Sequence, residues 1–394
     1  MLTLSPAAKR SRGDRIAGAR ARSAGISWFG FAGGVLLFQL SHAWPILQHS
    51  NHRSSAGSTV SREPRYRVTS SRSPTGTSVE GMDSALSPGP RNGHGLAYDL
   101  QAGVLLLFGG ATADEVRGDT WLWKAGVWRE AFVRGPSPRT FPAVTYDVGR
   151  AEVVLFGGNQ VLFGDSVHAA VMLGDTWLWR REAWVRVGEH GPSARAEAAI
   201  AYDPRRKRTV LFGGYQYLQG HMVRLGDTWE WDGRRWLQVS LTGPPPRSGA
   251  AMAYDPSAGG VVLFGGSGGP RGDTWTWNGR EWVQLQVSDA PGRFNTAMDW
   301  DSSSERLVRF GGWDGTRRTS DTWELRAGGW VRVQEGGPSP RNHTVLVSAR
   351  DRSSVLLYGG HDGEMVFADL WERRNGRWIG LLCAAPIRRV SNGH

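Results

Sequence analysis

One motif recurs six times in this chain, and it limits the possible folds more than any other feature. Each copy contains an arginine, an apolar run that ends in two glycines, and then two tryptophans. In all six copies the first glycine lies 18 residues after the arginine, and the second tryptophan lies 7 residues after the first. The glycine-to-tryptophan interval alone varies, from 10 to 20 residues. Such regularity predicts a repeat architecture with insertions confined to one loop per unit.

The repeat positions can be followed in the printed sequence. The arginines are Arg91, Arg139, Arg195, Arg247, Arg293 and Arg341. The double glycines begin at Gly109, Gly157, Gly213, Gly265, Gly311 and Gly359. The first tryptophans are Trp121, Trp177, Trp229, Trp275, Trp323 and Trp371, and the second are Trp128, Trp184, Trp236, Trp282, Trp330 and Trp378.

Each repeat has the pattern of four short strands, A to D. Strand A follows the arginine, and strand B is the apolar run into the double glycine. Strand C contains the Asp-Thr-Trp sequence, with side chains alternating between two faces. A turn such as Asp232-Gly233 then leads to strand D, as in a hairpin. Six such units of about 50 residues predict an all-β fold, a six-bladed β-propeller with four antiparallel strands per blade, over residues 88–394.

The double glycine after an apolar strand, the later tryptophan pair and the Pro-Arg before the next strand resemble Kelch repeats. Repeats of this kind also form the central domain of galactose oxidase-like proteins. The resemblance covers residues 88–394 and implies a propeller, here of an exported bacterial type. It implies little about function, because one fold hosts many unrelated roles. Six complete blades are expected, closing without a strand borrowed from the other terminus. A degenerate seventh blade has no tryptophan pair to support it.

The repeated residues are expected to be structural. Sixteen of the 20 tryptophans occupy repeat positions, where large rings would fill the gaps between blades. The glycines allow positive φ and lack the helix, Lys and Ser/Thr of a phosphate loop. The repeat arginines are expected to bind acidic groups or backbone carbonyls, with a ligand-binding role for some of them left open. The aspartate of each Asp-Thr-Trp is expected to shape the start of strand C.

The N-terminus resembles an export signal. A basic stretch precedes an apolar run at residues 24–40, and Ala43 ends a small-x-small cleavage pattern. Residues 1–43 are therefore expected to be a cleaved signal peptide or, alternatively, an N-terminal membrane anchor. Residues 44–87 have the composition of a disordered linker. These patterns predict a secreted or cell-envelope protein, with any membrane attachment through residues 24–40.

The net charge of +11 does not indicate a nucleic-acid-binding domain. Residues 1–72 carry 11 Lys and Arg against 2 Asp and Glu, whereas the remainder carries 36 against 34. The basic charge therefore belongs to the N-terminal arm. A nucleic-acid-binding propeller would need a basic patch on the folded domain, so no nucleic-acid partner is expected.

Strand order predicts where a binding site would lie. The variable B–C loops and the Pro-rich D–A loops should share one rim, and variable loops on a rigid scaffold commonly carry function. The two longest loops, residues 159–174 and 215–226, supply the candidates Asn159, Phe163, Tyr215, Tyr217 and His221. These loops could form a partner surface, or they could simply pack on each other.

Further rim candidates follow the repeat motif. Those directly after a double glycine are Trp313, Asp314, His361 and Asp362. By position, Arg341 and Asn342 resemble residues with which Kelch propellers of ubiquitin-ligase adaptors grip peptides. Together these residues predict recognition of a protein or glycan ligand, whose identity the sequence leaves open.

Enzyme chemistry has little support in the sequence. Cys383 is the only cysteine, so neither an intramolecular disulfide nor the Cys-Tyr copper site of galactose oxidase-like enzymes is indicated. We expect no catalytic residues, no metal and no cofactor, and a monomer that acts as a non-catalytic binding scaffold. The alternatives are a carbohydrate-directed enzyme with its site at the mouth of the central channel, and a structural envelope protein.

Overall fold

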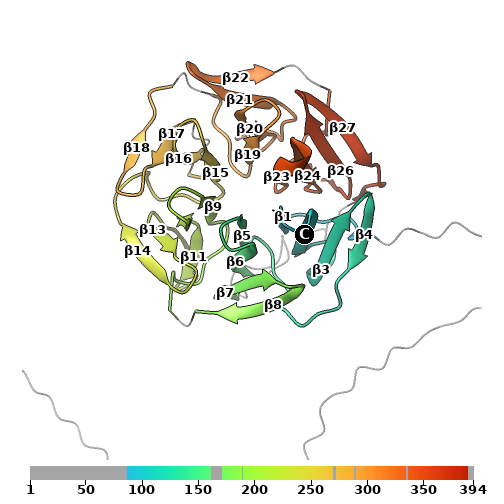
Figure 1. Cartoon of the computed structure of the whole chain (residues 1–394), viewed down its shortest axis with the longest axis horizontal. Helices are drawn as coiled ribbons and strands as arrows, with labels where there is room; N and C mark the ends of the chain where they lie inside the picture. Colours follow the sequence, from blue (N-terminus) through green and yellow to red (C-terminus); the bar gives the residue numbers. More distant parts are fainter. Residues whose placement is uncertain are drawn as a thin grey trace, which may run out of the picture. The chain divides into compact units, whose positions relative to one another are not determined.

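The six repeats form six four-stranded antiparallel sheets arranged as a ring in the computed structural model of the chain (Figure 1). The structure describes residues 87–160, 171–188, 190–268, 272–287, 290–333 and 336–388. The expected six-bladed β-propeller is therefore confirmed. Residues 1–43, the expected linker up to residue 86, and Phe163 lie outside the described residues.

Every blade is built from one repeat. Blade 1 contains β1 (Gly95–Asp99), β2 (Val104–Ala111), β3 (Val116–Lys124) and β4 (Val127–Glu130). Blade 2 contains β5 (Ala143–Asp147), β6 (Glu152–Asn159), β7 (Met172–Arg180) and β8 (Ala183–Val187). Blade 3 contains β9 (Ala199–Asp203), β10 (Arg208–Phe212), β13 (Thr228–Trp231) and β14 (Trp236–Ser240).

The second half of the ring repeats this plan. Blade 4 contains β15 (Ala251–Asp255), β16 (Gly260–Phe264), β17 (Thr274–Trp277) and β18 (Trp282–Gln284). Blade 5 contains β19 (Ala297–Asp301), β20 (Arg306–Phe310), β21 (Thr322–Arg326) and β22 (Gly329–Val333). Blade 6 contains β23 (Val345–Ala349), β24 (Ser354–Tyr358), β26 (Leu370–Arg374) and β27 (Arg377–Leu382).

Blades 3 and 6 contain short additional elements outside their four-stranded sheets. The B–C loop of blade 3 forms a hairpin of β11 (Tyr215–Leu218) and β12 (His221–Arg224). In blade 6, β25 (Met365–Val366) pairs with β28 (Ile387–Arg388), and a 3-10 turn, η2 (Arg350–Arg352), follows β23. Strand A of each blade lies next to the axis and strand D on the perimeter (Figure 1). All six blades are contiguous in the chain, and β1 lies beside β23 where the ring closes.

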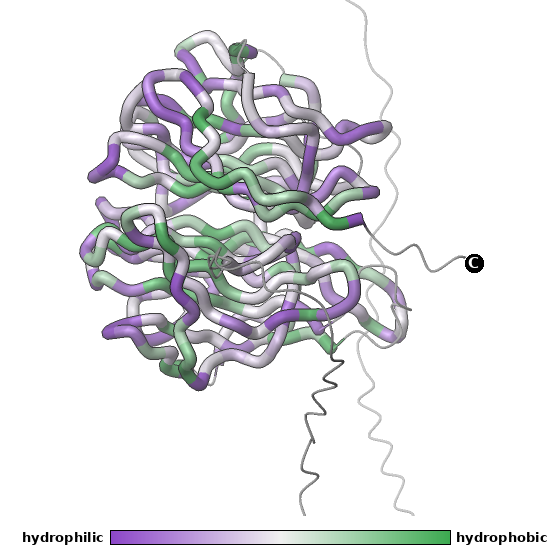
Figure 2. Tube along the Cα trace, turned by 90° about the vertical axis from the view of Figure 1, so that its right-hand side faces the viewer, coloured by the Kyte–Doolittle hydropathy of each residue, from purple (hydrophilic) through white to green (hydrophobic). Residues whose placement is uncertain are grey.

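The core lies between blades, where apolar side chains of strands B and C meet. Hydrophobic stretches follow the strand interiors, and hydrophilic ones mark many of the turns (Figure 2). Each strand-D tryptophan packs against the aromatic residue that ends strand B of the preceding blade, as Trp184 does on Phe108 with ring centroids 5.4 Å apart. The same contact between Trp128 and Tyr358 closes the ring. This packing accounts for the repeated tryptophans.

The repeat arginines bind the aspartates that precede strand C. Arg139 donates from Nη1 to Asp175 Oδ1 at 2.6 Å and to the Gly157 carbonyl at 3.0 Å, and from Nη2 to Asp175 Oδ2 at 2.9 Å. Trp177 Nε1 donates to the same carboxylate. Burial alone would raise the pKa of Asp175, but the hydrogen bonds and charge of Arg139 outweigh burial and lower it. The expectation that the repeat arginines bind acidic groups or backbone carbonyls is confirmed, and the aspartates that precede strand C are these acidic groups.

Candidate binding site at the loop rim

The D–A and B–C loops share one rim of the propeller, as the strand order predicts. In five blades the residue directly after the repeat arginine forms an antiparallel bridge with the residue directly after the double glycine. Ala196 pairs with Tyr215 in this way, and Asn342 pairs with His361. These bridges hold both loops of a blade in one layer above the strands.

A ring of six residues closes the axis at this rim. Its members lie two positions after the repeat arginines and all have positive φ; they are Gly93, Phe141, Glu197, Gly249, Asn295 and His343. Five of the six backbone N–H groups donate to the carbonyl of the ring residue in the preceding blade, for example from Phe141 to Gly93 at 2.7 Å and from Asn295 to Gly249 at 2.8 Å. We call these six residues the rim ring.

Side chains of the rim ring lie over the glycines of the preceding blades. A Cβ added at Gly93 would meet Cε1 of Phe141 at 2.7 Å, and one at Gly249 would collide with Oδ1 of Asn295. The two glycines therefore leave room for the side chains that follow them. The side chains of Phe141, Glu197, Asn295 and His343 thus gather at the axis, although they come from four different blades.

Glu197 anchors the first half of a polar network. Its Oε2 accepts a hydrogen bond from Ser248 Oγ at 2.9 Å. Ser248 Oγ also lies 2.9 Å from Ser267 Oγ, which accepts a hydrogen bond from Arg224 Nε at 2.8 Å. Blades 3 and 4 are thereby joined across the rim.

His343 anchors the second half. Its Nε2 lies 2.6 Å from Asn295 Nδ2 and 3.7 Å from Glu197 Oε1. Its Nδ1 lies 2.8 Å from His361 Nε2, and the two imidazoles are stacked with centroids 5.1 Å apart. Phe141 covers the other side of the network, with its ring 4.9 Å from that of His343. A carboxylate, an amide, the imidazole of His343 and an aromatic ring are thus within reach of one ligand, with His361 buried behind His343.

The candidate residues in the hairpin of blade 3 differ in their burial. Tyr215 is buried and accepts a hydrogen bond at its Oη from Asn159 Nδ2 at 2.8 Å. Burial, followed by the charge of Glu197, raises the pKa of Tyr215 and of the half-buried Tyr217. His221 is exposed at the far end of the hairpin, paired with Leu218. Tyr217 is therefore the tyrosine placed for ligand contact.

The candidates of blades 5 and 6 gather around Arg318. Its guanidinium lies 4.8 Å from the centre of the Trp313 ring, and Nε donates to Asn342 Oδ1 at 3.2 Å. Burial lowers the pKa of Arg318, and the charge of Asp362 opposes this shift. Asp314 accepts backbone N–H bonds within its own turn, which outweigh its slight burial and lower its pKa to about 2.

Arg341 belongs to the scaffold. Its side chain is 1% exposed, and its guanidinium binds Asp369 and the carbonyls of Gly359 and Ser339. No donor is left for a ligand. His361 and Asn342 are also buried, so they support the rim from beneath while Trp313 and Asp362 are half-buried at its surface.

Sequence reasoning missed Glu197, Ser248, Asn295 and His343. When the six repeats are aligned on the arginine, the position two residues later holds Gly, Phe, Glu, Gly, Asn and His, and the positions on either side of it vary as well. The sequence therefore carries no signal that singles out the rim-ring position from its neighbours.

The described residues hold no group of three or more His, Cys, Asp or Glu side chains arranged to bind a metal ion. In the same part of the chain, no helix is long and apolar enough to span a membrane. No protein-family model matches the chain. The chemistry available at the rim is therefore read from the side chains alone: hydrogen bonding, aromatic contact, the carboxylate of Glu197 in the rim ring, and the charges of Asp314, Arg318 and Asp362 beside it.

Proposed function

We propose that this protein is an exported Kelch-type propeller that acts as a non-catalytic scaffold and binds a protein segment or glycan on its rim ring. The resemblance of the repeats to Kelch repeats and the N-terminal export pattern support this proposal. The ligand would contact Glu197, Asn295, His343 and Tyr217 on a rigid surface, with little change in shape.

Backbone conformation is the observation that carries the proposal. Glu197 has φ of 52° and Phe141 has φ of 53°, in the left-handed region that disfavours side chains. Gly93 and Gly249 show that glycine fits the same ring position. Strain of this kind costs about 1 kcal/mol or more per residue and is concentrated at functional sites. The rim ring keeps functional side chains where glycine would stabilise the fold.

A carbohydrate-directed enzyme is the second candidate, because Glu197, His343 and His361 converge at the channel mouth. Glycoside hydrolysis commonly needs two carboxyl groups about 5–10 Å apart. The network described above contains one, Glu197, and its Oε2 already accepts the Ser248 hydroxyl. Binding is therefore the better-supported function.

Replacing Glu197 with glycine separates ligand binding from structure. We expect Glu197→Gly to raise the free energy of unfolding by about 0.5–1 kcal/mol and to abolish the signals of the wild-type protein on a glycan array and a peptide array. Glu182→Gly is the matched control, because Glu182 has φ of 57° in the C–D turn of blade 2, on the opposite face. The control should be stabilised similarly and should keep the wild-type array signals.

The results of this experiment distinguish binding, catalysis and a structural role for Glu197. Unchanged array signals for Glu197→Gly, or no wild-type signal on either array, would contradict the binding proposal. Turnover of an array glycan by the wild-type protein would favour the enzyme. A loss of stability in Glu197→Gly alone would mean that the side chain is structural.

A further inference from the structure

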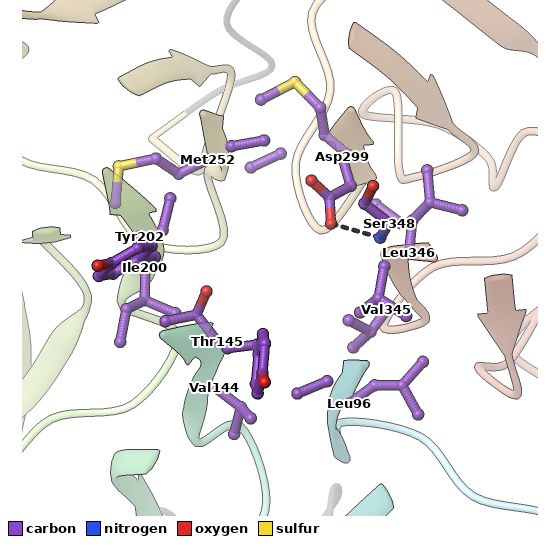
Figure 3. A pocket seen from close by; sticks show the side chains of 18 of the residues that line it. Leu96, Val144, Thr145, Ile200, Tyr202, Met252, Asp299, Val345, Leu346 and Ser348 are labelled. Carbon is purple, nitrogen blue, oxygen red and sulfur yellow. Dashed lines mark hydrogen bonds between the residues drawn. The ribbon is translucent and has the colours of Figure 1, made fainter. Parts of the chain in front are cut away.

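A cavity lies on the propeller axis, beneath the rim ring. Its volume is about 270 Å³, and residues of the six innermost strands line it (Figure 3). Its wall is mixed: the apolar side chains of Leu96, Val144, Ile200, Met252 and Leu346 line it beside polar groups of comparable exposed area. This volume is close to the lower limit of small-molecule sites.

The cavity opens on the face opposite the rim. At the rim end it is lined by His94, Pro142 and their equivalents, and the hydrogen-bonded rim ring lies directly beyond them in the chain. At the other end the lining includes Val148 and Arg350, both exposed to solvent. A ligand would therefore enter past the A–B turns, independently of any ligand on the rim.

One carboxylate lies among the side chains of this wall. Asp299 is the third residue of β19, and the equivalent positions of the other blades are Ala97, Thr145, Ala201, Ala253 and Val347. Its Oδ1 accepts the N–H of Trp300 at 2.7 Å. Its Oδ2 accepts the N–H of Ser348, also at 2.7 Å (Figure 3). A carboxylate has about four acceptor sites, so each oxygen retains capacity toward the cavity. The repeat does not require a charge here.

We propose that the axial cavity binds an alkylammonium group, with Asp299 as its counter-ion. The apolar side chains of the wall accommodate methylene groups, and the carboxylate accepts ammonium N–H bonds. Asp299 lies two residues, roughly 7 Å, from the open end of β19, a depth that the four-carbon stem of a lysine-type amine spans. A guanidinium would bind in bidentate geometry to both carboxylate oxygens of Asp299. Each of these oxygens already accepts one backbone N–H, from Trp300 or Ser348, so an ammonium group is the better match.

Calorimetric titration of the full-length chain at pH 8 tests the site directly. The probes are n-butylamine, the neutral isostere n-butanol, and N-acetyl-lysine methylamide. We expect millimolar binding of butylamine, at least tenfold weaker binding of butanol, and at least tenfold weaker binding of butylamine to Asp299→Asn. Asp314→Asn removes a rim carboxylate and should leave the affinity unchanged. Equal binding of butylamine and butanol, or equal binding by wild type and Asp299→Asn, would overturn the proposal.

The lysine derivative distinguishes two sources of the amine. Tighter binding of N-acetyl-lysine methylamide than of butylamine would identify a lysine side chain of a peptide, whereas weaker binding would identify a free alkylamine. Either result supports an alkylammonium site, and absence of binding for both overturns it.

The pH dependence of butylamine binding to the wild-type protein is a second test of the role of Asp299. Burial raises the pKa of Asp299 to about 6, against the opposing hydrogen bonds from Trp300 and Ser348 and the charge of Arg350. The other titratable lining groups stay in one form from pH 4.5 to 8, because burial lowers the pKa of His94 to about 3 and raises that of the lining tyrosines, Tyr98, Tyr146, Tyr202 and Tyr254. The guanidinium of Arg350 remains cationic throughout. Butylamine affinity should therefore fall as pH drops through about 6, and a flat profile would contradict the role of Asp299.

Discussion

At the scale of single residues, Arg309 is the clearest departure from the repeat. The equivalent residues of the other blades are Leu107, Leu155, Leu211, Leu263 and Leu357. Arg309 is fully buried, and none of its guanidinium nitrogens has a hydrogen-bond partner among the described residues. It lies between the rings of Phe264 and Trp323, 4.5 and 4.8 Å from their centres. Burial lowers its pKa to about 9, against the charge of Asp321.

Replacing this arginine should stabilise the protein. Arg309→Leu removes a buried charge without hydrogen bonds, and we expect the free energy of unfolding to rise by roughly 1–3 kcal/mol in urea denaturation. Arg373→Leu is the control, since Arg373 is equally buried but is paired with Asp301 and Glu324. Its loss should destabilise by about 3–5 kcal/mol. Destabilisation in both variants would show that the aromatic contacts of Arg309 outweigh its desolvation.

At the scale of elements, a hydrogen bond joins neighbouring blades beneath the rim. The strand-D tryptophan donates from Nε1 to the threonine of Asp-Thr-Trp in the preceding blade, as Trp236 does to Thr176 Oγ1 at 2.9 Å. Four other tryptophans make the same bond. In blade 6 leucine replaces the threonine at Leu370, and Trp128 Nε1 has no partner among the described residues.

Thr176→Val removes the hydrogen bond from Trp236 Nε1 with almost no change in side-chain volume. It leaves a buried indole N–H without a partner, and we expect a loss of about 1–2 kcal/mol in the free energy of unfolding. Thr209→Val is the matched control, because Thr209 is fully buried in β10 and its hydroxyl has no partner in the described part of the chain. That variant should be neutral or slightly stabilising. Equal effects of the two substitutions would mean that the indole bond contributes nothing.

The elements could be predicted from the sequence, and the site could not. Strand order, blade number and the shared rim follow from spacing, because a fixed interval between repeat residues fixes the register of each blade. The partners of Glu197, Ser248 and His343, depend on distances between blades, which spacing within one repeat does not contain. Tyr215 and Trp313 attracted attention as loop aromatics, whereas the rim network centres on Glu197 and His343, which occupy a repeat position.

At the scale of the whole molecule, the ring has one interface that no loop connects. Blade 1 meets blade 6 through the backbone bonds from Arg91 N to Phe367 O, from Gly93 N to His343 O and from Gly360 N to Arg91 O, each 2.9–3.1 Å long. The other five interfaces make similar contacts but are also joined by D–A loops. Among the described residues no strand near one terminus completes the blade at the other, so only non-covalent contacts between these residues close the propeller.

This closing interface should open first. Local opening exposes amides according to the free energy of the opened unit, and blades joined by a loop cannot separate as far as blades 1 and 6. Native-state hydrogen exchange should therefore be at least tenfold faster at Gly93 and Gly360 than at Glu197 and Gly158, whose amides make the equivalent bonds between blades 2 and 3. Equal protection at all four amides would show that the ring opens only by global unfolding, and that the Trp128–Tyr358 contact compensates for the missing loop.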